Sequence, residues 1–269
     1  MSEITNTFIF NPIRPDFIDR CLDTLYKYTS CDFRVILIDQ TVDGIYDQVK
    51  DKVDLYLRSK RINLGFAKSS NEGMIHALHW KSKFVTPCND DIEFINKNWW
   101  EGAVKTFEYY PTAGLVNPYS VIDRNEAEGR LPYKEEYSEA DYQFLLQTHR
   151  NGTVPWVMDG ICMWMPIFRR EILEEVGLYD ERFYPGGGED YDFNTRLYKK
   201  GYKCLGTAGA FVYHHWGKSK DDTERGLIET PTIDRSRVWN DLSSLYGGKH
   251  DIYGNCPDRT SEVATVDIR

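Results

Sequence analysis

The sequence predicts an α/β protein with a mixed, mainly parallel central sheet that is flanked by helices. Short apolar segments alternate with helical patterns through the first half of the chain, as in sheets whose strands are joined by helices. One such segment, Val35–Ile38, is a continuous apolar run of the type buried on both faces of a parallel sheet. Polar residues stand at the ends of three strand candidates, where an open α/β sheet binds its ligands.

The elements of the first half follow from the spacing of apolar residues. After Asp16, apolar residues recur with the three- and four-residue spacing of a helix face. The same reasoning predicts strands at Thr7–Phe10, Leu55–Leu57, Phe84–Thr86 and Ala113–Val116, and helices at Ala67–Trp80 and Trp99–Tyr109. Asn11, Asp39 and Asn89-Asp90-Asp91 close predicted strands, so we expect them to meet at one edge of a doubly wound sheet.

The second half begins with an irregular stretch, residues 118–155, which is rich in Tyr, Glu and Asn and contains one helix candidate from Ser138. Regular patterns then return, with strands predicted at Val157–Met165 and Ala210–Tyr213 and helices at Arg169–Val176, Glu189–Lys199 and Ser236–Tyr246. We therefore expect one main domain over residues 1–222, with halves of about 1–117 and 118–222. Residues 223–269 are expected to form a helical extension and a tail.

Composition and sequence signals restrict the class of protein. The formal net charge of −9 excludes a global basic surface for nucleic acid. The six cysteines are scattered and form no CxxC pair, which indicates free thiols rather than zinc ligands or disulfides. The chain does not begin with a signal-peptide pattern, and no apolar run approaches the roughly 20 residues of a membrane span. We expect a soluble protein that is cytoplasmic or peripheral to a membrane.

Two motifs have the chemistry of a divalent metal site. Asn89-Asp90-Asp91 closes a predicted strand, and its carboxylates are the oxygen ligands that Mg²⁺ and Mn²⁺ use when they bridge a diphosphate. His214-His215 closes another strand, and either imidazole has the nitrogen to complete the coordination shell. The alternatives are acidic residues that cap a turn and histidines that lie at the surface or in the core.

A glycine-rich loop leads into a predicted helix at Gly186-Gly187-Gly188-Glu189-Asp190. Glycines let the backbone approach a ligand closely, and a carboxylate here can act as the general base for an acceptor hydroxyl. The alternative is that Asp190 caps the helix.

Asn63-Leu64-Gly65-Phe66-Ala67 precedes another predicted helix. The N–H groups at that helix start would suit a diphosphate or a sugar hydroxyl, and the alternative is a plain loop. Lys218 is a candidate phosphate partner, although most lysines are simply solvated.

In their order along the chain these motifs resemble the family 2 glycosyltransferases of the GT-A fold, with the rhamnosyltransferase-like members closest. The resemblance extends over about residues 7–217, and Asn89 stands where many members have Asp. Its parts are Phe8–Pro15, Val35–Asp39, Asn63–Ala67 with Asn71 and Gly73, Asn89–Asp91, Met158–Gly160, Arg169–Glu171, Val176–Phe183, Gly188–Phe193 and Tyr213–His215.

The resemblance implies a direct displacement with inversion at the anomeric carbon. Asp190 would be the base with Glu189 beside it, and Asp91 with His214 would hold Mn²⁺ or Mg²⁺. The implied donor-binding residues are Asn11, Arg14, Asp39, Asn63, Gly65, Asn71, Asn89, Asp90 and Lys218. The implied acceptor-binding residues are Asp159, Gly160, Trp164, Gly187 and Gly188.

The resemblance also implies the partners. Asp39 favours a pyrimidine base, so a UDP- or dTDP-sugar is the expected donor, whereas related enzymes also use guanine donors. The acceptor classes are a glycan, a lipid-linked sugar, a protein or a modified nucleobase.

Two other classes of protein are alternatives. A nucleotidyltransferase would share the sheet and the carboxylates, but it should have a glycine-rich basic loop after the first strand, and Asn11–Pro15 has no glycine. A non-catalytic glycan- or nucleotide-binding protein on a transferase scaffold is the other, and intact Asp91, Asp190 and His214 argue against it.

Overall fold

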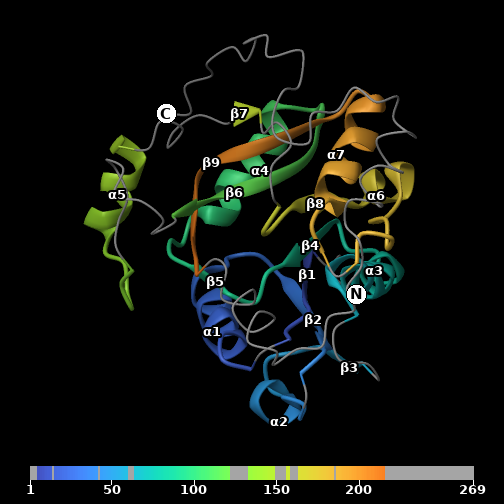
Figure 1. The fold of residues 1–269 in the computed structure, drawn as a ribbon. Coiled ribbons are helices and arrows are strands. Elements are labelled where there is room, and N and C mark those ends of the chain that lie inside the picture. Colours follow the sequence, from blue (N-terminus) through green and yellow to red (C-terminus); the bar gives the residue numbers. More distant parts are fainter. Residues whose placement is uncertain are drawn as a thin grey trace.

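The computed structural model describes residues 5–13, 15–41, 43–59, 64–121, 133–148, 156–157, 163–184 and 186–215. The N-terminal half contains four parallel strands in the order β3-β2-β1-β4. Its strands are β1 (Asn6–Phe10), β2 (Phe33–Asp39), β3 (Leu55–Arg58) and β4 (Phe84–Cys88), and its helices are α1 (Ile18–Tyr28), α2 (Tyr46–Val49) and α3 (Phe66–His79). Figure 1 shows α1 and α3 on either side of β1 and β2.

The C-terminal half continues the same sheet in the order β8-β6-β9-β5, and β7 pairs with β9. Its strands are β5 (Ile92–Phe94), β6 (Ala113–Val121), β7 (Trp156–Val157), β8 (Ile167–Arg169) and β9 (Lys203–His214). Its helices are α4 (Trp99–Tyr109), α5 (Glu139–Thr148), α6 (Arg170–Val176) and α7 (Glu189–Lys199). The parallel ladders are longer than the antiparallel ones, so the prediction of a mixed, mainly parallel sheet is confirmed.

The register of the parallel strands sets the position of the polar residues at their ends. Phe10 pairs with Leu37 on one side and with Cys88 on the other. Because these strands run in the same direction, Asn11, Asp39 and the residues after Cys88 lie at one edge of the sheet. This confirms the convergence that the sequence predicts.

Apolar side chains on both faces of the sheet form the core. Helix α3 packs on β1, β2 and β4, and α4 packs on β6 and β9. The fully buried indole of Trp99 lies 6.0 Å from the ring of Phe8 and 5.0 Å from that of Phe94, measured between ring centroids. These contacts join α4 to β1 and β5, so the two halves share one core.

A second, smaller apolar cluster holds α5. Leu145 of α5 is buried together with Ile95, Phe211 and Tyr213, and Tyr142 packs against them. Figure 1 shows α5 beside one end of β9, away from α7. Within the described residues, no helix is long and apolar enough to cross a membrane.

The structure corrects one predicted element and adds three short ones. Residues 163–165 of the predicted strand Val157–Met165 are not in a strand: β7 ends at Val157 and β8 starts at Ile167. An apolar run by itself does not separate a strand from a buried irregular segment. The sequence also missed α2, β5 and β8, whose three or four residues are too few for a periodic pattern. The predicted helix Ser236–Tyr246 lies outside the described residues.

Candidate functional site

A buried acid–histidine pair lies where β4 ends. Asp91 Oδ1 lies 3.0 Å from His214 Nε2, and each side chain is 6% exposed. Antiparallel pairing of β5 with β9 brings them together, because Ile92 pairs with His214 and the His215 N–H donates to the Asp91 carbonyl at 3.0 Å. The strand register, rather than sequence proximity, therefore creates this pair.

Of the two adjacent histidines, His214 is the one beside Asp91. Successive side chains of a strand point to opposite faces. His215 accordingly lies on the other side, with its Nε2 2.8 Å from Glu93 Oε1.

The Asp91–His214 pair fits a divalent cation. Ligand atoms about 2.1 Å from an octahedral cation and at right angles to each other lie roughly 3 Å apart, which matches the observed 3.0 Å. The same separation also serves an N–H···O hydrogen bond in the metal-free protein. When His214 Nε2 is unprotonated, two electron-rich atoms face each other at this distance, which favours a cation. Among the described residues, no group of three His, Cys, Asp or Glu is placed to hold a metal.

Asn89 and Asp90 complete the loop after β4. Asn89 Nδ2 lies 3.2 Å from His214 Nε2, and the Asn89 backbone N–H donates to the Trp164 carbonyl at 2.9 Å. Both Asn89 and Asp90 are partly exposed, in contrast to the buried Asp91. Asn89 is therefore in direct contact with one member of the acid–histidine pair.

The glycine-rich loop positions two carboxylates at the start of α7. Gly187 and Gly188 have φ angles of 99° and 114°, which a residue with a Cβ rarely adopts. Gly188 is the N-cap, so the alternative in which Asp190 caps the helix is wrong. Glu189 Oε2 accepts the Gly187 N–H at 2.6 Å and closes the loop on itself.

Asp190 is a buried carboxylate with an altered proton affinity. Its exposure is 8%, and its Oδ1 accepts the Tyr191 N–H at 2.9 Å. Burial raises the pKa of Asp190, and this effect outweighs the backbone N–H groups, including that of Met163, that stabilise the charged form. At a given pH this carboxylate holds a proton more strongly than an exposed Asp does.

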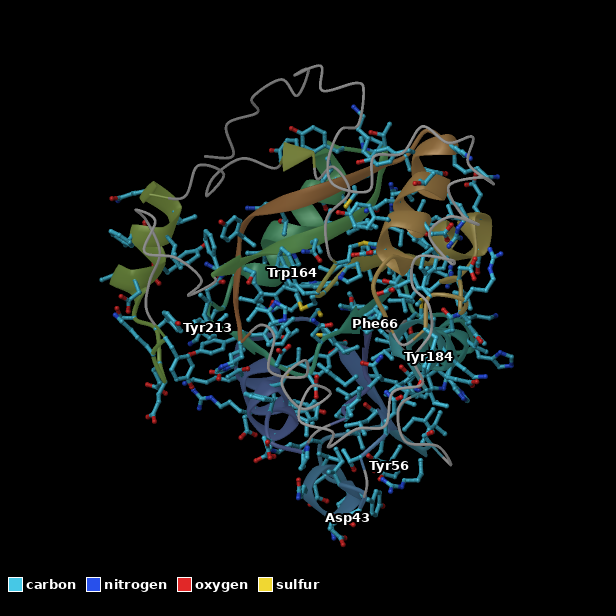
Figure 2. All side chains as sticks on the ribbon, viewed as in Figure 1. Asp43, Tyr56, Phe66, Trp164, Tyr184 and Tyr213 are labelled. Atoms are coloured by element: carbon cyan, nitrogen blue, oxygen red, sulfur yellow. The ribbon has the colours of Figure 1, made fainter. Side chains whose placement is uncertain are left out.

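Two consecutive residues connect Asp190 to the acid–histidine pair. The Met163 backbone lies near enough to the Asp190 carboxylate to stabilise its charged form and so to lower its pKa, while the neighbouring Trp164 carbonyl accepts from the Asn89 N–H. The Trp164 indole also lies 6.1 Å from the His214 ring, measured between centroids. Figure 2 shows Trp164 near the middle of the molecule. The candidate base and the candidate metal ligands therefore belong to one site.

Asp39 is fully buried, and its carboxylate accepts five hydrogen bonds. Oδ1 accepts the N–H and the hydroxyl of Thr41 at 2.8 and 2.7 Å, and Oδ2 accepts the Ile45 N–H, the Tyr56 hydroxyl and Arg58 Nη1, the last at 2.5 Å. Burial acts to raise the pKa of Asp39, but the bonds from Tyr56, Thr41 and Arg58 outweigh it and lower that pKa. Asp39 therefore fixes the loop that joins β2 to α2.

Asn11 and Gly65 lie where β1 meets the start of α3. Asn11 Nδ2 donates to Ser69 Oγ at 2.8 Å and to Ser70 Oγ at 3.1 Å. Gly65 is the N-cap of α3 with φ 83°. Gln40 was missed by the sequence analysis, although it follows Asp39 directly. Its Nε2 donates to the Asn11 carbonyl at 3.0 Å, so it ties the two loops together.

Five of the predicted site residues lie outside the described part of the chain: Arg14, Asn63, Asp159, Gly160 and Lys218. Asn71 is described. It lies on α3 and is buried against the 179–181 loop, where its carboxamide bonds to the Tyr179 backbone and to Glu181. The sequence did not predict Tyr56, Arg58 or Glu93 as site residues. Their contacts with other elements, such as those of Tyr56 and Arg58 with Asp39, appear only in the structure.

Comparison with solved structures gives the fold. A crystal structure of GalNAc-T7 with UDP, GalNAc and Mn²⁺ aligns with a TM-score of 0.58 at 15% identity, over 79% of this chain and 44% of that one. Residues 1–349 of S. aureus TarS align with a TM-score of 0.56 at 15% identity, over 78% of this chain and 60% of that one. The TarS complex with UDP-GlcNAc gives a TM-score of 0.56 at 14% identity, over 80% and 60%. At these identities the likeness shows the fold, which is GT-A.

The sequence itself gives the family. No curated protein matches the chain. The chain spans about half the length of the similar structures. Residues 8–177, more than half of the chain, match the model of glycosyl transferase family 2. The chain therefore belongs to glycosyl transferase family 2.

Proposed function

We propose that this protein is an inverting, metal-dependent glycosyltransferase that moves a sugar from a nucleoside-diphosphate sugar to an acceptor hydroxyl. One observation carries the proposal. The Met163–Trp164 segment lies near the buried base candidate Asp190 and bonds to the loop that pairs Asp91 with His214. A base on one side and candidate ligands for a diphosphate-bound metal on the other are the two parts that such a transfer needs.

The reaction is a single displacement. Asp190 accepts the proton of the acceptor hydroxyl while its oxygen attacks the anomeric carbon on the face opposite the leaving group. The bond from that carbon to the diphosphate oxygen breaks, and its electron pair leaves with the nucleoside diphosphate. The raised pKa of Asp190 makes it a stronger base than an exposed Asp. Glu189 supports this step by holding the Gly187 amide.

The leaving diphosphate needs positive charge in an acidic protein. Asp91 and His214 are the side chains that would hold Mn²⁺ or Mg²⁺, and the cation supplies that charge when it is bound. Two protein ligands suit such a site, since substrate phosphates and water complete the coordination. The Mn²⁺ in the GalNAc-T7 structure supports this part of the proposal.

The donor is proposed to be a UDP-sugar, with a dTDP-sugar as the second candidate. The UDP of the GalNAc-T7 structure and the UDP-GlcNAc of a TarS structure support this choice. Asn11, Asp39 and Gly65 lie at the sheet edge and helix start where the nucleotide would bind. A direct contact between Asp39 and the base stays a prediction, and it requires the exchange of one of its five bonds.

The acceptor side stays at the level of prediction. Gly187 and Gly188 belong to the loop that leads into Asp190, and Trp164 follows Met163, whose backbone lies near that carboxylate, which supports their proposed role in acceptor binding. A glycan, a lipid-linked sugar, a protein and a modified nucleobase remain the acceptor classes, and closeness to rhamnosyltransferase-like members remains a prediction.

Calorimetric titration tests the donor site. UDP, dTDP and GDP are each titrated into the protein with and without Mn²⁺. We expect one pyrimidine nucleotide to bind, with an affinity that depends on Mn²⁺ and is lost in Asp91→Asn. Absence of binding by all three nucleotides in both conditions would contradict the donor site and favour a non-catalytic protein.

The variant Asp190→Asn tests the base. It should bind the nucleotide as the wild type does but lose transfer, because the amide does not accept the acceptor proton. Near-normal turnover in this variant would contradict the assignment of Asp190 as the base. A nucleotidyltransferase would instead release pyrophosphate from a nucleoside triphosphate, so release of pyrophosphate is measured alongside transfer.

A further inference from the structure

A second buried carboxylate lies two residues after Asp91. Glu93 of β5 is 4% exposed and accepts three hydrogen bonds from three separate parts of the chain. Arg20 Nε on α1 donates to Oε2 at 3.0 Å. The Tyr133 hydroxyl, ahead of α5, donates to Oε1 at 3.1 Å, and His215 Nε2 lies 2.8 Å from the same oxygen. Glu93 is therefore the common hydrogen-bond partner of α1, of the chain at the end of β9 and of the 133–148 segment.

Two acid–histidine pairs lie at the β5–β9 ladder. These pairs are Asp91–His214 and Glu93–His215, and the two histidines part because consecutive residues of a strand point opposite ways. Only Ile92, Glu93 and Phe94 form the β5 side of this ladder. A ladder this short has few main-chain bonds to fix its register, so side-chain bonds at its end matter more than they do in a long strand.

The 133–148 segment is fastened to this ladder. The Tyr133 ring lies 5.2 Å from the His215 ring and 5.0 Å from the Tyr213 ring, measured between centroids. Arg20, besides its bond to Glu93, donates to the Glu135 carbonyl. The 133–148 segment therefore contacts the part of the chain that carries the candidate metal ligands.

We propose that Glu93 is a positioning residue of the metal and diphosphate site, and that the 133–148 segment supports this site through it. The inference rests on the proposed function. By holding His215 and Tyr133, Glu93 keeps the end of β9 against β5, so that His214 stays beside Asp91. If the Glu93 carboxylate is removed, the bonds to Arg20, Tyr133 and His215 are lost, and the chain that ends β9 loses its side-chain link to β5.

Three variants separate this role from a general loss of stability. Glu93→Gln keeps the size of the side chain but removes its charge, and Tyr133→Phe removes one hydroxyl. Tyr202→Phe is the matched control, because the Tyr202 hydroxyl also donates to a glutamate, Glu175 on α6, at 2.7 Å. The affinity for Mn²⁺ is measured by electron paramagnetic resonance, with and without UDP, and thermal unfolding is followed in parallel.

We expect Glu93→Gln to weaken Mn²⁺ binding by about 10- to 100-fold, in the range of variants in the residues that orient metal ligands. Tyr133→Phe should weaken it several-fold, and Tyr202→Phe should leave it unchanged. Because the defect lies in affinity, excess Mn²⁺ should restore kcat in both weakened variants. A structural role alone would lower the unfolding temperature without changing the affinity for Mn²⁺.

Asp91→Asn is measured alongside as a reference. If Asp91→Asn loses Mn²⁺ while Glu93→Gln and Tyr133→Phe bind it as the wild type does, the positioning role is wrong and the metal site stands. If Asp91→Asn itself binds Mn²⁺ normally, the proposed metal site is wrong. If Glu93→Gln does not fold, Tyr133→Phe decides: weaker Mn²⁺ binding supports the role, and unchanged binding overturns it.

Discussion

Asn71 bonds to both backbone groups of Tyr179, although 108 residues separate the two in sequence. Its Nδ2 donates to the Tyr179 carbonyl at 2.9 Å, and its Oδ1 accepts the Tyr179 N–H at 3.0 Å. A further bond from Nδ2 reaches Glu181 Oε1 at 3.2 Å. Asn71 lies on α3 of the donor half, and the 179–181 loop precedes the glycine-rich loop of the candidate base. The two halves of the site are therefore joined by one buried carboxamide.

Asn71→Leu should destabilise the protein by about 3 kcal/mol, because it leaves the N–H and carbonyl of Tyr179 buried without partners. Urea unfolding measures the free energy change. Lys68→Ala is the control, since the Lys68 ammonium lies 3.9 Å from Glu181 at the surface and such pairs contribute little. A change below about 0.5 kcal/mol in Asn71→Leu would contradict the bracing role.

Asp39→Asn should lower the free energy of unfolding by about 2 kcal/mol at neutral pH, because the amide cannot accept all five donors. The pKa of Asp39 is lowered in the folded protein. Its stabilising effect is therefore complete above the ordinary Asp pKa of about 3.9 and is lost as the pH falls through the folded value. The difference between wild type and variant, measured by urea unfolding at pH 7 and below, should shrink in acid. A difference that stays constant down to pH 3 would contradict this account.

The acid limb of kcat/KM should lie above the ordinary Asp pKa of about 3.9, because burial raises the pKa of Asp190 and the base must be unprotonated. Activity should fall as the pH drops through this raised value. The profile is measured with saturating Mn²⁺. The variant Asp190→Glu should still show an acid limb of kcat/KM, but at a different pH. A limb at or below the ordinary value would argue against Asp190 as the base.

Gly73→Ala should destabilise the protein by about 1–3 kcal/mol, although alanine favours a helix over glycine by about 1 kcal/mol. A Cβ at this position of α3 would lie 2.2 Å from Cγ2 of the buried Ile9 on β1, so the helix would be forced away from the sheet. A double-mutant cycle measures the conflict. In an Ile9→Ala background the same substitution should be neutral or stabilising, and an equal cost in both backgrounds would rule out this contact as the cause.

Most helices and strands were predictable because each has a local pattern of its own. The run Val35–Ile38 is the centre of β2, and the predicted helix Trp99–Tyr109 has the bounds of α4. Where the local pattern was short or ambiguous, prediction failed. β5 has three residues, and the apolar run after Val157 contains an irregular segment. In both places the structure depends on pairing with distant strands.

The candidate site divides along the same line. The sequence alone determined the fold class, the common edge of Asn11, Asp39 and Asn89, and the acidic residues at the start of α7, because periodicity and position along the chain specify them. The tertiary structure decided that His214 rather than His215 faces Asp91, that Asn71 braces the base loop, and that Glu93 joins three elements. Those roles depend on strand register and on contacts between residues that lie far apart in the sequence, and no local pattern contains either.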